Sequence, residues 1–375
     1  MTKSGNRTVA GRLVLDDRVD AGRIHVADGR IQAIELDDKQ ADGPLIGPGL
    51  VDIHVHGWGG HDAVDGRLAL DGMARSLLRQ GVTGFLPTAV TAPIDVLERF
   101  ANDIRAWSSE PRADGAQPLG FNLEGPFISP VKKGAQNPAF ILEPARADRG
   151  RLSGLLDGLR VITIAPEVDG ALNLISWFAE RGVVVSLGHS NATATQAALG
   201  YAAGAKSTTH LFNAMSGVEQ HAPGLAVTAL THDAAYIELV ADGFHVDPAV
   251  WPIILRTKPT NRLMLVSDAI SLAGTGDGRS TLGGLEVEVH DGQCRLVSNG
   301  ALAGSVIAVD TAVRQLVAAG VPLPRAIGAG SYRPLELLGI EDRGRIAPGQ
   351  RADLVELDDD LRVLRVMLAG NWVVP

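Results

Sequence analysis

The sequence feature that most constrains the fold is a series of eight short apolar runs, separated by segments of helical character. The runs are Leu50–Val55, Val82–Leu86, Leu119–Leu123, Val161–Ile164, Val183–Leu187, Ser207–Leu211, Tyr236–Val240 and Leu263–Val266. Near-continuous apolar strands indicate burial on both faces, as in a parallel sheet. Eight such strands that alternate with helices over roughly 220 residues predict a (β/α)8 barrel.

The predicted helices are Leu70–Gln80, Ile94–Trp107, Leu172–Arg181, Thr193–Ala203 and Ala249–Arg256. The two ends of the chain follow a different pattern, in which short apolar runs are broken by turn signals, as in β-hairpins. We therefore expect the α/β fold class, with a (β/α)8 TIM barrel over residues 49–344. Residues 1–48 and 345–375 would pair into a small, discontinuous β-sandwich, and residues 285–297 would form a hairpin after the eighth strand.

Composition narrows the classes of partner and compartment. The chain has 34 Lys and Arg against 43 Asp and Glu, a formal net charge of -9. This acidic balance argues against a nucleic-acid or anionic-membrane partner. Cys294 is the single cysteine, so no internal disulfide can form, as is typical of a reducing compartment. No leading apolar segment and no run of ~20 apolar residues is present, so we expect a cytoplasmic protein.

Six polar side chains fall at the C-terminal ends of five of the expected strands. They are His54 and His56 on the first, Glu124 on the third, His189 on the fifth, His210 on the sixth and Asp268 on the eighth. Residues two apart on a strand face the same side, and active sites of (β/α)8 barrels are built at this face. A His and carboxylate set without cysteine suits a hydrolytic Zn²⁺, Fe²⁺ or Mn²⁺ centre.

Each of these side chains also has a simpler interpretation. Histidines can be satisfied inside a barrel without binding a metal, and Glu124 by itself is equally consistent with a salt bridge in a loop. The shared position favours the metal site, because unrelated histidines would scatter over helices and loops as well.

The sequence also resembles the N-acetylglucosamine-6-phosphate deacetylases of the amidohydrolase superfamily. The matching segments are GLVDIHVHGWGGHD (49–62), NLEGPFISPVKKGA (122–135), SLGHSNA (186–192), THLFNAM (209–215), ADGFHVD (241–247), SDA (267–269) and ALAGS (301–305). They lie in family order over nearly the whole chain. The resemblance implies hydrolysis of an N-acetyl amino sugar 6-phosphate to acetate and the amino sugar.

The resemblance also implies roles for individual residues. Glu124, His189 and His210 would bind the principal divalent ion, with Zn²⁺ as the leading candidate and Fe, Mn or Co as alternatives. His54 and His56 would bind a second ion, which some family members lack, so one or two ions per subunit are expected. Asp268 would be the general base and acid. The implied substrate-binding residues are Ala135, Gln136, Asn213, Ala214, His221, His245, Leu302, Ala303 and Gly304.

Two further expectations follow from the family pattern. The His245 position reaches toward the phosphate from a neighbouring subunit, which implies a homodimer with a shared active site. Gln136 stands where the family usually has His, and His221 stands where a phosphate-binding Arg is expected. Reaction type is therefore better determined than the identity of the sugar.

Three alternatives stay open at this point. The chain could deacetylate an unphosphorylated or differently configured amino sugar. It could be another amidohydrolase, although the carboxylated lysine that many relatives place at a strand end has no counterpart here. It could also be a non-catalytic scaffold, which would be expected to have lost metal ligands.

Overall fold

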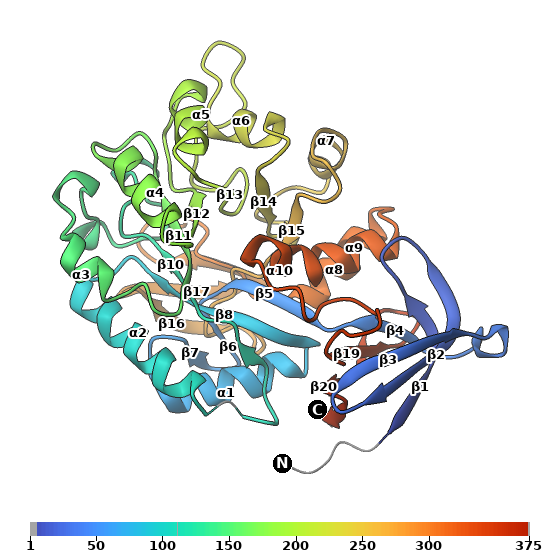
Figure 1. Ribbon diagram of the computed structural model, residues 1–375. Helices are drawn as coiled ribbons and strands as arrows, with labels where there is room; N and C mark the ends of the chain where they lie inside the picture. The colour runs from blue at the N-terminus through green and yellow to red at the C-terminus, as the bar shows by residue number, and fades with distance from the viewer. Residues whose placement is uncertain (1–5, 111, 374–375) are drawn as a thin grey trace.

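The computed structural model describes residues 6–110 and 112–373. Its larger part is a ring of strands surrounded by helices, and the two ends of the chain meet in a sheet beside it (Figure 1). Among the described residues, no helix combines the length and the apolar character needed to cross a membrane.

Eight parallel strands form the barrel, in the order of the sequence. They are β5 (Leu50–Val55), β8 (Val82–Val90), β10 (Phe121–Glu124), β11 (Leu159–Ile164), β12 (Val184–Leu187), β13 (Ser207–Thr208), β14 (Tyr236–Leu239) and β15 (Leu263–Leu265). A parallel bridge between Val55 and Ala269 joins the last strand region to the first. The short β9 (Gln117–Pro118) pairs with β8 outside this ring. All eight predicted strands are confirmed, and with them the barrel.

The helices of the described residues lie mostly outside the ring. They are α1 (Arg67–Leu78), α2 (Ile94–Ser108), α3 (Arg149–Ser153), α4 (Ala171–Ala179), α5 (Ala194–Ala202), α6 (Leu225–Thr231), α7 (Trp251–Thr257), α8 (Val309–Ala318), α9 (Leu323–Ala329) and α10 (Tyr332–Leu338). The short 3-10 turns are η1 (Asp38–Gln40), η2 (Pro130–Lys132), η3 (Pro138–Phe140) and η4 (Pro144–Arg146). The five predicted helices are present, and α5 starts with a capping box between Thr193 and Gln196.

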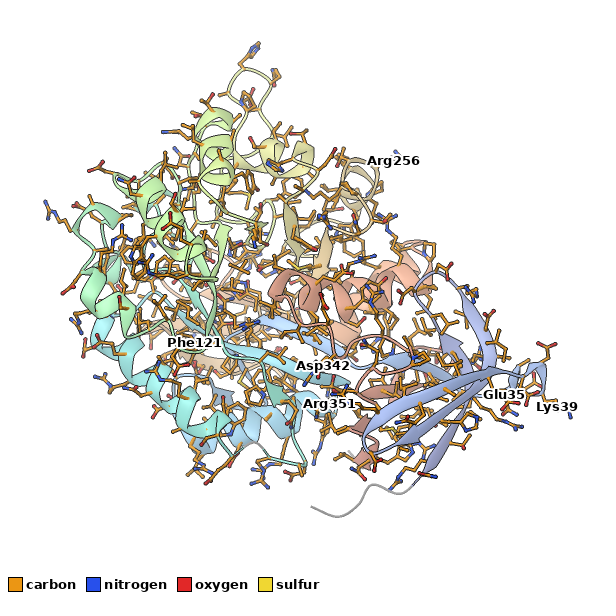
Figure 2. All side chains as sticks on the ribbon, viewed as in Figure 1. Glu35, Lys39, Phe121, Arg256, Asp342 and Arg351 are labelled. Atoms are coloured by element: carbon orange, nitrogen blue, oxygen red, sulfur yellow. The ribbon has the colours of Figure 1, made fainter. Side chains whose placement is uncertain are left out.

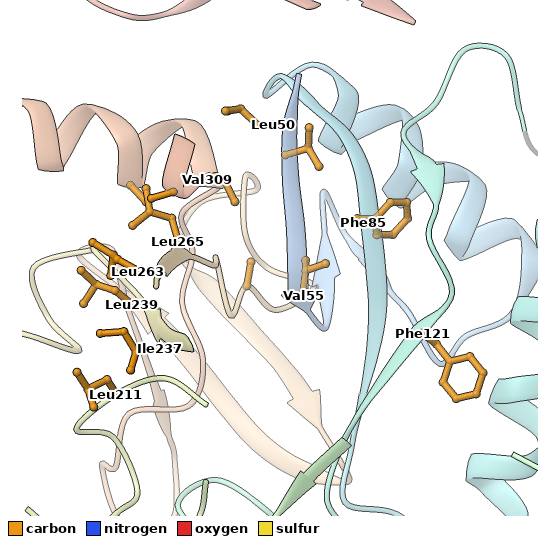
Figure 3. Packing of buried hydrophobic residues seen from close by; sticks show 14 of the residues in the cluster. Leu50, Val55, Phe85, Phe121, Leu211, Ile237, Leu239, Leu263, Leu265 and Val309 are labelled. Carbon is orange, nitrogen blue, oxygen red and sulfur yellow. The ribbon is translucent and has the colours of Figure 1, made fainter. Parts of the chain in front are cut away.

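The main core lies between the barrel strands and the helices. Phe85 of β8 meets Trp107 of α2 with ring centroids 5.9 Å apart, and Phe121 of β10 meets Phe100 of α2 at 5.6 Å, both edge to face. Figure 3 shows Phe85 and Phe121 pointing away from the ring toward this layer. Since apolar side chains fill the outer layer, alternate strand residues are free to carry polar groups inside the barrel.

Both ends of the chain contribute to one seven-stranded sheet. Its order is β21 (Asn371–Val373), β20 (Val363–Leu368), β19 (Leu354–Leu357), β4 (Leu45–Pro48), β1 (Arg7–Val14), β2 (Val19–Ala27) and β3 (Arg30–Leu36). The sheet is antiparallel except where β4 pairs with β1. In Figure 2, Glu35 and Lys39 lie at its outer edge, whereas Asp342 and Arg351 lie where it meets the barrel. Since β4 ends at Pro48 and β5 begins at Leu50, this sheet leads directly into the barrel.

A three-stranded antiparallel sheet follows β15, as predicted, although it begins before the expected hairpin. Its strands are β16 (Gly278–Leu282), β17 (Leu285–His290) and β18 (Gln293–Leu296). The turn between β16 and β17 reaches the end of β8, because a Cβ placed on Gly283 would lie 2.9 Å from Val90 Cγ2. The last pair of strands, β6 (Gly57–Trp58) and β7 (His61–Asp62), lies in the loop after β5. These loops surround the C-terminal face of the barrel.

Candidate metal centre and active site

The structure brings the six predicted donor residues together at the C-terminal face of the barrel. They form two buried groups, and within each group the donor atoms lie within 4.8 Å of one another. One group is Glu124, His189 and His210, and the other is His54, His56 and Asp268. Donors from five different strands thus meet in one place, as the strand-end positions predict.

In the first group, two imidazoles converge on one carboxylate. Glu124 Oε1 lies 2.9 Å from His189 Nε2 and 2.8 Å from His210 Nε2, and these two nitrogens are 3.1 Å apart. The carbonyl oxygen of Lys132 lies 3.0 Å from His189 Nδ1, which orients Nε2 toward the site. Two ring nitrogens and a carboxylate oxygen this close suit a divalent cation between them.

In the second group, the Nδ1 atom of each histidine contacts an oxygen on the side of the ring away from the site. Glu238 Oε2 lies 3.0 Å from His54 Nδ1, and the carbonyl oxygen of Thr88 lies 3.1 Å from His56 Nδ1. His56 Nε2 is 3.1 Å from Asp268 Oδ1, whereas the fully buried His54 Nε2 has no hydrogen-bond partner among the residues that the structure describes. Because an unpaired buried polar atom is costly, this nitrogen fits a metal ligand better than a structural side chain.

Glu124, a member of the first group, also approaches the histidines of the second. Its Oε1 is 3.5 Å from His54 Nε2, and its Oε2 is 3.4 Å from His56 Nε2. This carboxylate is therefore within reach of ions in either group, and the donor set fits one ion or two.

The backbone is strained at three of the donors. His189, His210 and Asp268 have φ values of 45°, 28° and 52°, a left-handed region that side chains other than glycine seldom adopt. Such strain persists only where surrounding structure holds it, and it gathers at functional sites. At the ends of β12, β13 and β15, the backbone therefore adopts an unfavourable conformation that directs these three side chains into the site.

The electrostatics keep Asp268 ionised. Burial disfavours its carboxylate, but the hydrogen bond from His56 and the charge of His54 outweigh this and hold the pKa of Asp268 at about 2. For His56, burial opposes protonation, but its contacts with Asp268 and Glu124 raise its pKa to about 9. In this arrangement Asp268 is ionised at neutral pH.

The donors open into a pocket of about 220 Å³, which we call the metal pocket. It is lined by His56, Glu124, Gly134, Ala135, Gln136, His189, His210, Asn213, Ala214, His245, Asp268, Leu282, Ala301, Leu302 and Gly304. Most of the predicted substrate-binding residues are among them. His245 lines the metal pocket of its own chain, where Asp242 Oδ2 lies 2.7 Å from its Nδ1.

Two predicted substrate residues do not line the metal pocket. His221 is exposed on the loop between β13 and α6, and Ala303 is fully buried. A third residue, Gln136, lines the pocket but is already engaged. Its Oε1 accepts a hydrogen bond from Thr91 N at 2.7 Å, and its Nε2 donates to Glu124 Oε2 at 2.5 Å. Gln136 therefore holds Glu124 in place, whatever it does for a substrate.

Sequence reasoning missed Glu238, which binds His54 Nδ1 and accepts a hydrogen bond from His210 N at 3.1 Å. A signal was present, since Glu238 interrupts the apolar strand Tyr236–Leu239, and a buried carboxylate needs a partner. Leu282, Gly134 and Ala301 were missed as well. Gly134 and Ala301 lie within the matching segments 122–135 and 301–305, whereas nothing in the local sequence marks Leu282 as a pocket residue.

Comparisons with known proteins agree with this geometry. The Amidohydrolase family matches residues 45–373. N-acetylgalactosamine-6-phosphate deacetylase of Escherichia coli O157:H7 is 38% identical, with 96% of this chain and 97% of that protein covered. N-acetylglucosamine-6-phosphate deacetylase of Bos taurus is also 38% identical, with 90% of this chain and 85% of that protein covered.

Solved structures give the same result. A mutant N-acetyl-D-glucosamine-6-phosphate deacetylase from Mycobacterium smegmatis, in complex with N-acetyl-D-glucosamine-6-phosphate, has a TM-score of 0.92 at 31% identity, with 99% of this chain and 100% of that chain covered. The N-acetylglucosamine-6-phosphate deacetylase of Thermotoga maritima has a TM-score of 0.92 at 33% identity, with 98% of this chain and 99% of that chain covered. The chain belongs to the amidohydrolase family, in the group formed by the amino sugar 6-phosphate deacetylases.

Proposed function

We propose that the protein is a metal-dependent deacetylase that hydrolyses N-acetylglucosamine-6-phosphate, or a close N-acetyl amino sugar, to acetate and the amino sugar phosphate. The observation that carries this proposal is the convergence of two buried donor groups at the C-terminal face of the barrel, one of which includes Asp268. The likeness to deacetylases over nearly the whole chain supports it.

The histidines and Glu124 would bind the metal ions. Glu124, His189 and His210 would hold the principal ion, and His54 and His56 a second; the buried, unpartnered His54 Nε2 supports this assignment. A bound divalent ion supplies Lewis acidity, which activates water and polarises an amide carbonyl. Zn²⁺ suits a set of histidines and carboxylates without cysteine.

Asp268 would carry the proton. Its carboxylate takes a proton from the attacking water as the new C–O bond forms at the acetyl carbon. The protonated carboxyl then gives that proton to the amide nitrogen as the C–N bond breaks. Water and the amide are consumed, and acetate and the free amine result, with Asp268 restored to its ionised form.

Sugar and phosphate would lie on the side of the pocket lined by Asn213, Ala214 and His245. We further propose that the protein is a cytoplasmic homodimer with a subunit-shared active site, and that the exposed His221 approaches the substrate's phosphate there. His221→Arg should then increase kcat/KM for the phosphorylated sugar more than for the plain sugar, because Arg binds phosphate through a fixed fork of donors. An equal change in kcat/KM for both sugars would show that His221 does not contact the phosphate.

The experiment that tests the function is an acetate-release assay with purified, metal-loaded protein. The substrates are the N-acetyl derivatives of glucosamine 6-phosphate, galactosamine 6-phosphate, mannosamine 6-phosphate and plain glucosamine. We expect the highest kcat/KM with a 6-phosphate and no turnover after chelation. Since one 38% identical relative is an N-acetylgalactosamine-6-phosphate deacetylase, the galacto epimer is the second candidate. Full activity in metal-free protein would refute the mechanism.

A further inference from the structure

A second, larger hollow adjoins the metal pocket. This hairpin cleft, as we call it, has a volume of about 410 Å³, within the range of small-molecule sites. One wall is the loop after β5, the second is the end of β8 with the first turns of α2, and the third is the turn between β16 and β17. Much of its lining is apolar, including Val64, Val90, Val96, Leu97 and Phe100.

The hairpin cleft and the metal pocket have two residues in common, His56 and Leu282. His56 is a predicted metal ligand. Leu282 ends β16, has 5% of its surface exposed, and belongs to a small hydrophobic cluster with Val90 and Ile270. Leu282 is therefore an uncharged wall between the metal pocket and the cleft, and it is free of any metal-binding role.

The order of strands in the barrel indicates which part of a substrate would face this wall. Asn213 and Ala214 follow β13, His245 follows β14, and His56 follows β5. The turn next to Leu282 touches Val90 at the end of β8. β8 lies across the ring from β13 and β14. If the sugar occupies the β13–β14 side and its amide lies at the metal donors, the acyl carbons point toward β8 and Leu282.

We propose that Leu282 sets the length of the acyl group, and that the hairpin cleft behind it is a latent site for longer, apolar acyl chains. This proposal rests on the amide hydrolase function proposed above. In the native protein the wall stops the chain after the acetyl methyl. Shortening residue 282 joins the two cavities, so that additional methylenes of the acyl group enter the apolar cleft.

The test uses the N-acetyl, N-propionyl and N-butyryl forms of the best amino sugar 6-phosphate, assayed by release of the free amine. For the native enzyme we expect kcat/KM to fall by roughly 10- to 200-fold for each added methylene, the range typical of a closed apolar pocket. Leu282→Ala should raise the butyryl-to-acetyl ratio of kcat/KM by at least about 10-fold, the lower end of that range. Leu282→Val, a milder change, should raise it less.

Leu285→Ala is the matched control. Leu285 faces Leu282 across the same turn, and it packs against the same hydrophobic cluster, but it lines neither the metal pocket nor the hairpin cleft. It should therefore weaken the hairpin without changing the acyl ratio. An equal rise in Leu285→Ala, or an unchanged ratio in both Leu282 variants, overturns the proposal.

A filling substitution gives an independent check. Val96 of α2 lines the cleft but not the metal pocket, so Val96→Trp should leave acetyl turnover as it is. Combined with Leu282→Ala, it should abolish most of the gain for butyryl, and a gain that persists contradicts the proposal. Failure of the proposed function would look different, because no acyl form would then release amine in the native protein.

Discussion

The two groups of donors differ in how their histidines are held. In the first group, His189 is held by a backbone carbonyl, and His210 Nδ1 has no hydrogen-bond partner within residues 6–110 and 112–373. In the second group, His54 is held by the buried carboxylate of Glu238. The first pair of histidines also sits on strained backbone at strand ends, whereas His54 lies within β5.

This difference indicates that the two groups depend on different parts of the molecule. A carboxylate behind a histidine makes the imidazole a more basic ligand and fixes its orientation. The imidazole of His54 therefore relies on a side chain from β14, whereas His56 and His189 are each held by a backbone carbonyl. Glu238 reaches the first group only at the main chain of His210. Glu124 connects them, since each of its oxygens lies within 3.5 Å of a histidine of the second group.

The largest effect is expected from Glu124→Ala, because this change removes a donor that both groups approach. An open three-ligand site loses a third of its protein donors. We expect loss of bound metal and a fall in kcat on the order of 10⁴-fold or more. Metal content by mass spectrometry and acetate release measure both. A variant that keeps its metal and most of its activity would show that Glu124 is not a ligand.

Asp268→Asn should separate proton transfer from metal binding. The amide keeps the shape of the carboxylate but cannot accept the proton of water, so kcat should fall by ~10²–10⁴-fold. Metal bound by Glu124, His189 and His210 should remain. Near-native turnover would assign the base to another residue, with His245 the first to examine.

Glu238→Gln tests the comparison directly. The amide can still occupy the same volume and accept from His54, but it removes the negative charge behind the imidazole. We expect the affinity of the second group for metal to fall by about 10- to 100-fold, with the first group little changed. Stoichiometry is followed by titration of metal-free protein with Zn²⁺. Equal weakening of both ions would mean that the two groups do not act separately.

The smallest expected effect is on the pH dependence of stability, and it concerns Asp52, which precedes His54 by two positions on β5. It is fully buried, and its Oδ2 has no hydrogen-bond partner in the described part of the chain. Burial, opposed by hydrogen bonds from Ser267 and His54, raises its pKa to about 6. The folded state therefore favours the protonated acid, so this contribution to stability is complete below the unfolded pKa of about 4 and is lost as pH rises through 6.

Asp52→Asn should remove this dependence. Between pH 5 and pH 8, the unfolding free energy of the native protein should fall by about 1–2 kcal/mol relative to the variant. Denaturant unfolding of metal-free protein measures this difference, because a nearby cation would itself lower the pKa. The exposed Asp17→Asn serves as the control for charge removal. A difference that is constant with pH would contradict the argument.

The barrel and its donor residues could be predicted because both depend on local pattern. Continuous apolar runs at regular intervals have few alternatives to parallel strands, and parallel strands place their C-terminal residues on one face. His54, Glu124, His189, His210 and Asp268 are therefore brought together by their position at strand ends. That the two ends of the chain form β-structure together was also predictable, since their hairpins are marked by turn residues. The sequence predicted a small sandwich, and the structure has one seven-stranded sheet.

The sequence by itself thus determined the fold class, the face that carries the chemistry and the donor types. Tertiary structure alone decided which groups stand behind the donors. Glu238 contacts His54 although 184 positions of the chain separate them, and Gln136 is hydrogen-bonded to Thr91 at a separation of 45 positions. Leu282 becomes a wall only because its turn folds onto β8. The reason is physical: local periodicity specifies which way a side chain points, but its neighbours depend on how distant segments pack.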